Sequence, residues 1–352
     1  KILRRSYVVL LTNLFDSLTL KVKFMIKDNV LKSFKNKNVL VTGGTGLIGR
    51  QVVNILCDSD AKVKIVSLDK IKVNPGATHI YGDLTNFDFC KSVTKDMDFV
   101  FHLAGIKGSI EIVEKKPASI FVTLLMMNTN IMEACRINKV KKNVYTSTIG
   151  TYTNAEVFKE SEYRIDSIPM ELTSWSKRMA EMQIQTYKIQ YNLNNFAIVR
   201  PANVYGPGDN FDPKNAMVIP SLMYRIFSKE DPVIVWGDGS AIRDFAYSRD
   251  VAEGTILALY HGTNSGFVNL GSGKGSSIKE LVETLHSFLK FNYKFDTTKP
   301  AGFPKRVMDI SLAQKMIDYN PATTLLDGLK KTWNWFIKNQ DEYQQKKNYF
   351  NE

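Results

Sequence analysis

The chain has 352 residues, of which 44% are hydrophobic and 23% are charged, a composition typical of a globular protein and not of a disordered one. Its formal net charge is +12, but the lysines are scattered and no arginine-rich patch with interleaved aromatic residues occurs. We therefore expect no nucleic acid partner and favour an anionic small molecule. Cys57, Cys90 and Cys135 show no paired spacing and the four histidines lie far apart. We expect no disulfide framework and no metal site, and the cysteine usage favours a reducing, cytoplasmic location.

The first part of the chain, residues 1–37, is predicted to be an N-terminal extension, and we assign no catalytic role to residues 1–24. This stretch places basic residues before an apolar run, as a signal peptide does. Thr12, Asn13 and Asp16 interrupt that run, which is also too short to span a bilayer. We therefore expect no membrane partner, with weak membrane or partner contact as the alternative.

Short apolar runs then alternate with helical patterns. The expected strands span about 38–42, 62–69, 79–84, 98–105, 142–148 and 195–201. The expected helices follow the glycine turn after the first strand and span 119–137, 173–191, 277–290 and 324–338, the last two being peripheral. This alternation predicts an α/β fold, a Rossmann-type doubly wound parallel sheet with a smaller C-terminal substrate-binding part. The predicted units are a cofactor domain over 38–200, an interleaved substrate-binding part over 201–340, and a tail over 341–352.

The stretch "VTGGTGLIG" places Gly43, Gly46 and Gly49 at three-residue spacing between a strand and a helix. Such glycines let the backbone approach a pyrophosphate at the helix N-terminus. Asp69 lies 20 residues beyond Gly49, where an acid binds ribose hydroxyls and repels a 2′-phosphate. We predict NAD as the cofactor. Lys70 and Lys72 keep NADP open, and the alternative interpretation is a structural turn with a surface aspartate.

Five ordered motifs carry a resemblance over residues 38–338: "TGGTGLIG", "GDL", "FHLAG", "RPANVYGPGDNF" and "GDGSAIRDFAYSRDVAEG". Together they resemble the extended short-chain dehydrogenase/reductase family, and within it the NAD-dependent nucleotide-sugar epimerases, dehydratases and reductases. The resemblance implies a set of cofactor-binding residues: Gly43, Gly46, Leu47, Ile48, Gly49, Asp69, Asp83, Leu84, Ala104, Gly105 and Lys177. It implies that Thr148 bonds the reacting sugar oxygen and that Asn203, Arg243 and Arg306 bind the substrate diphosphate.

These substrate-side roles agree with elementary chemistry, because the planar fork of arginine pairs phosphate charges in bidentate fashion. Other interpretations stay open. Arg243 could instead form an ion pair with Asp244 or Asp250, and Thr148 could simply cap the end of a strand.

Among subgroups, the segments around residues 211–244 resemble GDP-sugar members such as GDP-fucose synthase. That resemblance implies a cysteine and a histidine for epimerisation, but Gly150 and Met217 stand at those positions. We therefore do not predict GDP-fucose synthase activity, and both GDP- and UDP-sugars remain candidate substrates.

The resemblance also implies a tyrosine four residues before Lys177, acting as general base, and Thr173 occupies that position. An aliphatic hydroxyl is too weak an acid for this role. Three explanations are open. In the first, another side chain moves the proton, with Tyr163 as the first candidate and Tyr152 or Glu171 as alternatives. In the second, Thr148 and a water molecule relay the proton to Lys177. In the third, the site binds NAD and a nucleotide sugar with slow turnover or none. Trp175 forms either a pocket wall or core packing.

The sequence as a whole predicts a nucleotide-sugar epimerase or dehydratase that works through a transient keto-sugar, with Thr148, Lys177 and Tyr163 as the catalytic candidates. The alternative is a catalytically impaired protein that binds NAD and a nucleotide sugar. The resemblance further implies a homodimer, formed through the helices at 119–137 and 176–191.

Overall fold

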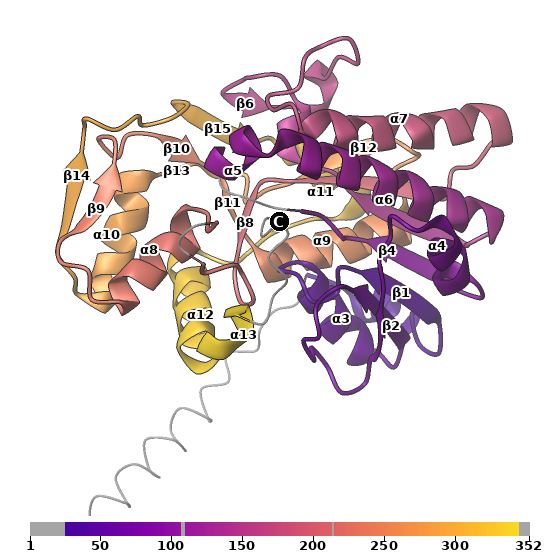
Figure 1. Ribbon diagram of the computed structural model, residues 1–352. Coiled ribbons are helices and arrows are strands. Elements are labelled where there is room, and N and C mark those ends of the chain that lie inside the picture. The colour runs from indigo at the N-terminus through magenta and orange to yellow at the C-terminus, as the bar shows by residue number, and fades with distance from the viewer. Residues whose placement is uncertain (1–24, 107–109, 213–214, 345–352) are drawn as a thin grey trace, which may run out of the picture.

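The computed structural model describes residues 25–106, 110–212 and 215–344, so residues 1–24 and most of the predicted tail lie outside the described residues. A seven-stranded parallel sheet in the order β12-β7-β5-β4-β1-β2-β3 forms the central layer (Figure 1). Its strands are β1 (Asn38–Thr42), β2 (Lys62–Ser67), β3 (Thr78–Tyr81), β4 (Phe99–His102), β5 (Lys142–Thr146), β7 (Phe196–Pro201) and β12 (Phe267–Leu270). The fold class is confirmed. The sequence predicted all of these strands except β12.

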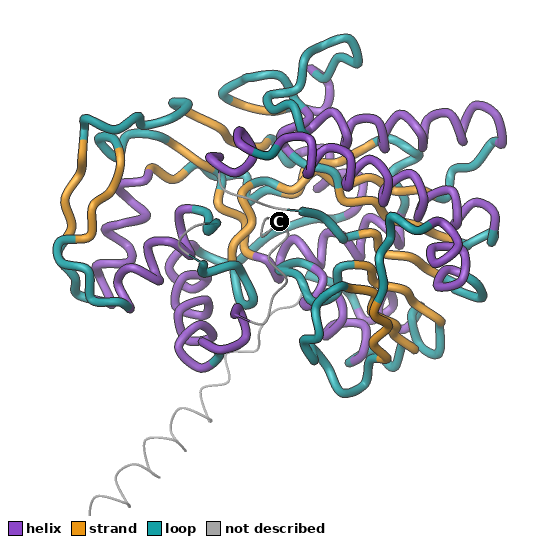
Figure 2. The backbone as a smooth tube through the Cα atoms, viewed as in Figure 1, coloured by secondary structure: helices purple, strands orange, loops and turns teal. Residues whose placement is uncertain are grey.

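Helices cover both faces of this sheet, as Figure 2 shows. One face carries α3 (Gly49–Cys57), α9 (Ser248–His261) and α11 (Ser311–Ile317). The other carries α4 (Phe87–Thr94), α6 (Pro117–Ile137), which follows the short α5 (Ile110–Lys115), and α7 (Ser174–Tyr191). Each face has its own cluster of buried apolar side chains, which explains why the strands read as nearly continuous apolar runs.

Helix α6 is long and apolar enough, by length and composition alone, to cross a membrane. In the structure it packs against α4 on one side and α7 on the other. Core helices of globular proteins have the same length and composition, and the position of α6 is that of a core helix.

A second, smaller part adjoins the carboxyl ends of the strands. It contains a four-stranded sheet of β6 (Val157–Phe158), β10 (Ile242–Arg243), β13 (Ser276–Ser277) and β15 (Lys305–Met308). Two strand pairs join it: β8 (Asn203–Tyr205) with β11 (Phe245–Tyr247), and β9 (Val233–Trp236) with β14 (Tyr293–Asp296). Its helices are α8 (Val218–Phe227), α10 (Ile278–Leu289), α12 (Leu325–Lys338) and α13 (Gln340–Gln344).

The two parts exchange elements. Strand β12 and helices α9 and α11 come from beyond residue 200 yet belong to the first part, whereas β6 comes from before residue 200 and joins the second. Segments from before and after residue 200 therefore alternate between the two parts. The expectation that the last two helices are peripheral is wrong, because α10 and α12 contribute Leu281, Leu285, Leu329 and Phe336 to the core of the second part.

The folded part of the chain also begins nearer the N-terminus than predicted. Residues 25–37 contain α2 (Asp28–Lys32), and Ile26, Val30 and Phe34 are buried. The Phe34 ring lies 5.4 Å from the ring of Phe99 on β4. The boundary at residue 37 is thus wrong, because this segment completes the core on one face of the sheet.

One buried arginine joins the two parts. Arg50, on α3, forms an ion pair with Glu342 of α13 and lies 5.0 Å from the Trp335 ring on α12. A side chain at Gly208, in the loop after β8, would lie 2.2 Å from Nε of Arg50. The cofactor-side helix is therefore packed directly against the C-terminal helices.

Candidate active site

The glycine turn between β1 and α3 is as tight as its sequence predicts. Gly43 has a φ of +67°, and a Cβ there would lie 2.7 Å from the Cα of Ala104. A Cβ at Gly49 would lie 2.2 Å from the Gly43 carbonyl oxygen. The backbone is therefore open at the N-terminus of α3, the position at which a pyrophosphate binds in such folds. Gly46, Leu47 and Ile48 form the rest of the turn.

Asp69 lies just beyond the end of β2, next to this turn. Its carboxylate accepts a hydrogen bond from the Thr45 hydroxyl at 3.0 Å. A carboxylate in this position accepts hydrogen bonds from ribose hydroxyls and repels a 2′-phosphate. Asp83 and Leu84 follow β3, and Ala104 and Gly105 follow β4. The structure thus places all the predicted cofactor residues except Lys177 along the carboxyl edge of the four neighbouring strands β1 to β4, and they fit a dinucleotide such as NAD.

Lys177 lies on the first turns of α7 and reaches this edge. Its Nζ donates a hydrogen bond to the carbonyl oxygen of Thr146 at 2.9 Å and lies 5.2 Å from the Tyr145 ring. A Cβ at Gly105 would be 3.7 Å from Nζ, so the amine faces the cofactor loop after β4. Burial lowers the pKa of Lys177 to about 8, although the charge of Glu181 acts in the opposite direction.

Thr148 begins the short 3-10 turn Ile149–Thr151 directly after β5. Its hydroxyl oxygen accepts a hydrogen bond from the Gly150 backbone N–H at 3.2 Å. The capping interpretation of Thr148 is therefore correct as a description of its local bond. The hydroxyl hydrogen stays available for a sugar oxygen, so both roles fit this position.

Thr173 is the residue immediately before α7. Its side chain is buried, and its carbonyl oxygen accepts a hydrogen bond from the Ser176 hydroxyl at 2.6 Å. The tyrosine position is thus filled by a small, covered side chain one helical turn before Lys177.

Tyr163 and Tyr152, the predicted substitutes for that tyrosine, belong to a different cluster. The Tyr163 ring lies 4.2 Å from the Arg200 guanidinium and 5.1 Å from that of Arg178. The Tyr152 hydroxyl donates to the Asn269 side chain at 2.9 Å. Burial raises the pKa of both phenols. Tyr163 packs on Arg178, Arg200 and Phe267 and, among the described residues, makes no contact with Lys177, which argues against it as the general base, although the two cations by themselves favour its phenolate.

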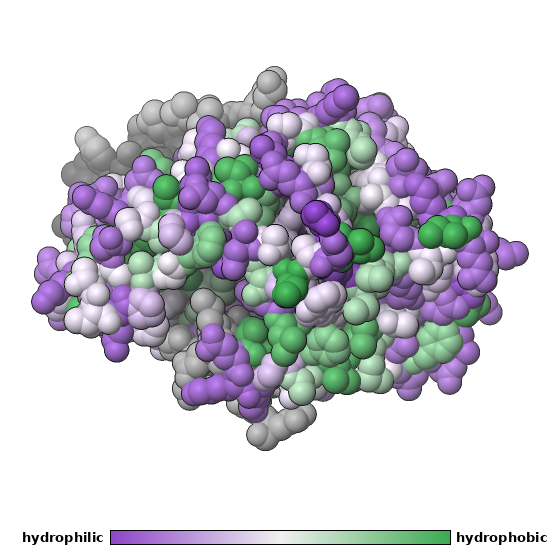
Figure 3. Space-filling model, turned by 90° about the horizontal axis from the view of Figure 1, so that it is seen from above, coloured by the Kyte–Doolittle hydropathy of each residue, from purple (hydrophilic) through white to green (hydrophobic). Residues whose placement is uncertain are grey.

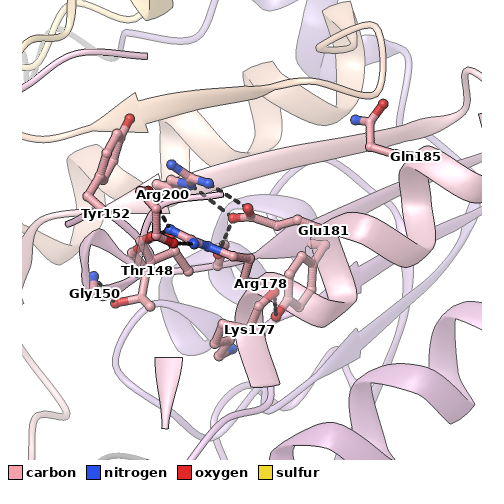
Figure 4. A network of polar contacts seen from close by, with 12 residues as sticks. Thr148, Gly150, Tyr152, Lys177, Arg178, Glu181, Gln185 and Arg200 are labelled. Atoms are coloured by element: carbon pink, nitrogen blue, oxygen red, sulfur yellow. Dashed lines mark hydrogen bonds and ion pairs between the residues drawn. The ribbon is translucent and has the colours of Figure 1, made fainter. Parts of the chain in front are cut away.

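That cluster was not predicted from the sequence. The Glu181 carboxylate forms a buried ion pair with Arg200, at 2.9 and 2.5 Å, and accepts from the Ser147 hydroxyl at 2.5 Å. In Figure 4 the Lys177 side chain points away from this network. The sequence feature that could have indicated this ion pair is the arginine inside the otherwise apolar strand β7, since a buried charge requires a partner.

Arg178 is the second residue that sequence reasoning missed. It is fully buried and bonds the carbonyl oxygens of Thr151 and Ser167. The ring of the partly buried Trp175 lies 5.2 Å from the Arg178 guanidinium, so Trp175 covers this arginine. Arg178 thereby ties the start of α7 to the turn that carries Thr148 and to the loop after Tyr163.

On the substrate side, Arg243 and Arg306 are direct partners in the parallel pairing of β10 with β15. Arg243 bonds the Phe303 carbonyl oxygen at 2.6 Å, and the Arg306 guanidinium lies 5.0 Å from the Phe303 ring. Burial lowers the pKa of both, and for Arg243 the charge of Arg306 adds to the effect. Asn203 adjoins them, since its backbone N–H bonds the Asp244 carbonyl at 3.1 Å.

The ion-pair alternative for Arg243 is wrong. The Asp244 carboxylate is buried and bonds Ser272 at 2.6–2.7 Å, and the Asp250 carboxylate bonds Thr323 at 2.8 Å. Glu171 is exposed, and its charge acts on Arg306, which places it on the same side of the site as that arginine. Within the part of the chain that the structure describes, no cluster of His, Cys, Asp and Glu could hold a metal ion.

Gly150 and Met217 stand where the GDP-fucose synthase resemblance would require a cysteine and a histidine. A Cβ at Gly150 would lie 2.4 Å from the Ser174 hydroxyl oxygen, so a larger residue there requires the Ser174 side chain to turn. Met217 stands immediately before α8. Neither position carries a side chain that can exchange a proton.

Comparison with known proteins identifies the family. Residues 39–271 match the NAD dependent epimerase/dehydratase family. The chain belongs to this family. It is 30% identical to a probable GDP-L-fucose synthase of Oryza sativa subsp. japonica over 318 residues, covering 87% of this chain and 93% of that protein.

Solved structures of the family agree. A UDP-N-acetylglucosamine 4-epimerase from Methanobrevibacter ruminantium, in complex with UDP-N-acetylmuramic acid, is 30% identical with a TM-score of 0.77, covering 86% of this chain and 99% of that one. A UDP-glucuronic acid 4-epimerase from Bacillus cereus, in complex with UDP-glucuronic acid and NAD, is 25% identical with a TM-score of 0.74 and the same coverage.

Proposed function

We propose that the protein is an NAD-dependent nucleotide-sugar epimerase or dehydratase that acts on a GDP- or UDP-sugar through a transient keto-sugar. Family membership, the glycine turn with Asp69, and Lys177 at the cofactor edge all support this activity. The relatives include proteins named for both GDP- and UDP-linked sugars, so either nucleotide fits the proposal.

The observation that carries the proposal is the pairing of Arg243 with Arg306 across two strands. Like charges directly opposite one another on a sheet destabilise it. Here burial and the charge of Arg306 depress the pKa of Arg243, and Asp244, the next residue, bonds Asn203 just beyond the end of β7. A diphosphate supplies two negative charges in one place, which offsets this repulsion. Asn203 adds a neutral amide beside it.

The remaining residues would then act on the sugar and the cofactor. Thr148 donates its hydroxyl to the sugar oxygen that reacts, and Lys177 lies where it contacts both the cofactor ribose and the sugar. Asp69 binds the adenosine ribose, and the N-terminus of α3 holds the pyrophosphate. Bound NAD supplies a hydride acceptor that later returns the hydride, so no net oxidation is required.

A second candidate function rests on Thr173. If no group replaces the tyrosine, the same site binds NAD and a nucleotide sugar without converting it. The buried placement of Thr173 favours this candidate, whereas the maintained set of cofactor, lysine and diphosphate residues favours turnover.

One experiment separates the two. The purified protein is incubated with NAD and a panel of GDP- and UDP-sugars, and the sugars are followed by proton NMR. We expect a new sugar to appear without net formation of NADH. Line broadening of a nucleotide sugar with no product would contradict turnover and support the binding function.

We further propose that the protein is a homodimer formed through α6 and α7. These adjacent helices expose Val122, Met126, Met179, Met182 and Ile189. Figure 3 looks down on this side of the molecule, where hydrophobic side chains lie among hydrophilic ones. Analytical ultracentrifugation should give twice the chain mass, and Met126→Glu combined with Met182→Glu should give a monomer. A monomeric wild-type protein would contradict the proposal.

A further inference from the structure

The residue that replaces the family tyrosine raises a question that the fold alone does not answer: which group accepts the proton when the sugar hydroxyl is oxidised? Among the residues that the structure describes, the titratable side chains near the ends of β4 and β5 and the start of α7 are few. Tyr163 is stacked between Arg178 and Arg200, and Tyr152 is bonded to Asn269. Glu171 lies on the same side of the site as Arg306, on which its charge acts.

The groups packed around Lys177 are also unsuited to the task. Tyr145, on β5, is buried with a raised pKa, and its hydroxyl accepts from Asn128 at 3.2 Å. His102, on β4, bonds Thr42 and Asn128 at 2.8 and 2.9 Å, and burial lowers its pKa to about 3. Glu181, on α7, is bound to Arg200 and Ser147. All three are engaged by neighbours within the protein.

We propose that the side-chain amine of Lys177 itself accepts the proton of the sugar hydroxyl, the step for which the family uses a tyrosine. This inference rests on the proposed function and deepens it. The O–H bond of the sugar breaks and an N–H bond forms on Nζ, while the hydride on the same sugar carbon leaves with its electron pair to NAD. The proton returns to the sugar oxygen when the keto-sugar is reduced again.

The geometry around Nζ supports this role. One hydrogen bond, to the Thr146 carbonyl oxygen, orients the amine, and the side chain faces Gly105 on the cofactor loop. Lys177 is partly buried and not sealed, so a ligand in the site can reach it.

The protonation equilibrium is consistent with the geometry. Because burial disfavours the charged ammonium, its pKa falls to about 8. At pH 7 about a tenth of the lysine would be neutral, and above pH 8 most of it would be. A general base is most effective when its pKa lies near the working pH.

The test compares variants at this position in the full chain. In Lys177→Arg the positive charge remains, but a guanidinium cannot accept a proton. We expect turnover to fall at least 100-fold in Lys177→Arg, with NAD affinity within threefold of wild type. Tyr163→Phe and Thr173→Val serve as controls that should keep turnover within about twofold, since neither hydroxyl is used.

Two further measurements address the lysine directly. The value of kcat/KM in the wild type should rise with pH through about 8. Competitive acetylation with acetic anhydride, read by mass spectrometry without any turnover, should titrate Lys177 at that same pH, with the exposed Lys290 as an internal reference. Adding Thr173→Tyr to the Lys177→Arg variant should raise its turnover at least tenfold, because a phenol next to a guanidinium can then act as the base.

The outcomes separate the two proposals. Absence of sugar conversion by the wild type overturns the proposed function, and the role of Lys177 with it. Wild-type conversion that persists in Lys177→Arg leaves the function in place and overturns the lysine as proton acceptor. Loss of conversion in Tyr163→Phe or Thr173→Val, or titration of Lys177 near pH 10, would also overturn it.

Discussion

Asp69 is the single side chain that most strongly selects the cofactor. Its carboxylate is oriented by Thr45 at 3.0 Å, at the point where the adenosine ribose of a dinucleotide lies. Replacing it with asparagine removes the charge that repels a 2′-phosphate and weakens the bonds to the ribose. We expect Asp69→Asn to lose about tenfold in NAD affinity and to bind NADP more tightly than the wild type does, measured by isothermal titration calorimetry.

The control for this variant is Asp88→Asn, on the exposed surface of α4 where Asp88 pairs with Lys91. It should change neither affinity. If the wild type already preferred NADP, Lys70 and Lys72 would dominate the choice, contrary to the prediction.

Single residues with fixed spacing were the part of the site most open to prediction. The glycines, Asp69 and Lys177 are defined by short motifs whose backbone geometry is nearly the same wherever they occur. The surroundings of Tyr163 were not predictable in this way, because its neighbours Arg178, Arg200 and Phe267 come from three separate elements. A tyrosine near a site in sequence can still point into a neighbouring cluster.

At the scale of elements, the start of α7 is held by Arg178. Its guanidinium bonds carbonyl oxygens on the turn of Thr148 and on the loop of Ser167. Arg178→Met removes the donor from the buried Thr151 carbonyl and from the partly buried Ser167 carbonyl, which costs about 2 kcal/mol of unfolding free energy in total. Urea denaturation should report this loss, and limited proteolysis should show faster cleavage between residues 151 and 170.

A matched control exists in the same loop. Arg164 is exposed and pairs only at the surface with Asp166, at 2.8 Å. Arg164→Met should leave both the denaturation midpoint and the cleavage pattern unchanged. Equal behaviour of the two variants would mean that Arg178 does not fasten the loop.

The helices and strands differ in how well they could be predicted from the sequence. Several long elements, such as α6, α7 and α12, were predicted to within a few residues, because apolar positions repeat with a clear period, whereas α8 and α9 were not predicted. Strands such as β6, β10 and β13 have two residues each, too few for any period to be visible. They form because distant segments pair, and the juxtaposition of Arg243 with Arg306 was therefore apparent only from the structure.

At the scale of the whole molecule, Arg50 and Glu342 fasten the cofactor helix to the C-terminal helices. Arg50 is 6% exposed, so loss of its partner leaves a charge in a poorly hydrated place. We expect Glu342→Gln to lower the unfolding free energy by about 2–3 kcal/mol, somewhat less than for a fully buried pair. Thermal denaturation followed by circular dichroism measures the effect.

The matching control is Glu283→Gln on α10, whose carboxylate lies 4.0 Å from Lys279 at the surface. Exposed ion pairs of this kind contribute little to the free energy of unfolding, so this variant should have the same melting temperature as the wild type. If Glu342→Gln and Glu283→Gln have equal melting temperatures, the ion pair between Arg50 and Glu342 does not stabilise the contact between the two parts.

The position of β12 at the edge of the large sheet has a consequence for synthesis on the ribosome. Its residues, Phe267–Leu270, pair with β7, which ends at Pro201. When the first 200 residues have emerged, β7 has its partner β5 on one side and an unpaired edge on the other. Such edges bind other chains. Some 70 further residues must follow before β12 covers this edge, so we expect a chain truncated after β7 to aggregate, which light scattering would measure.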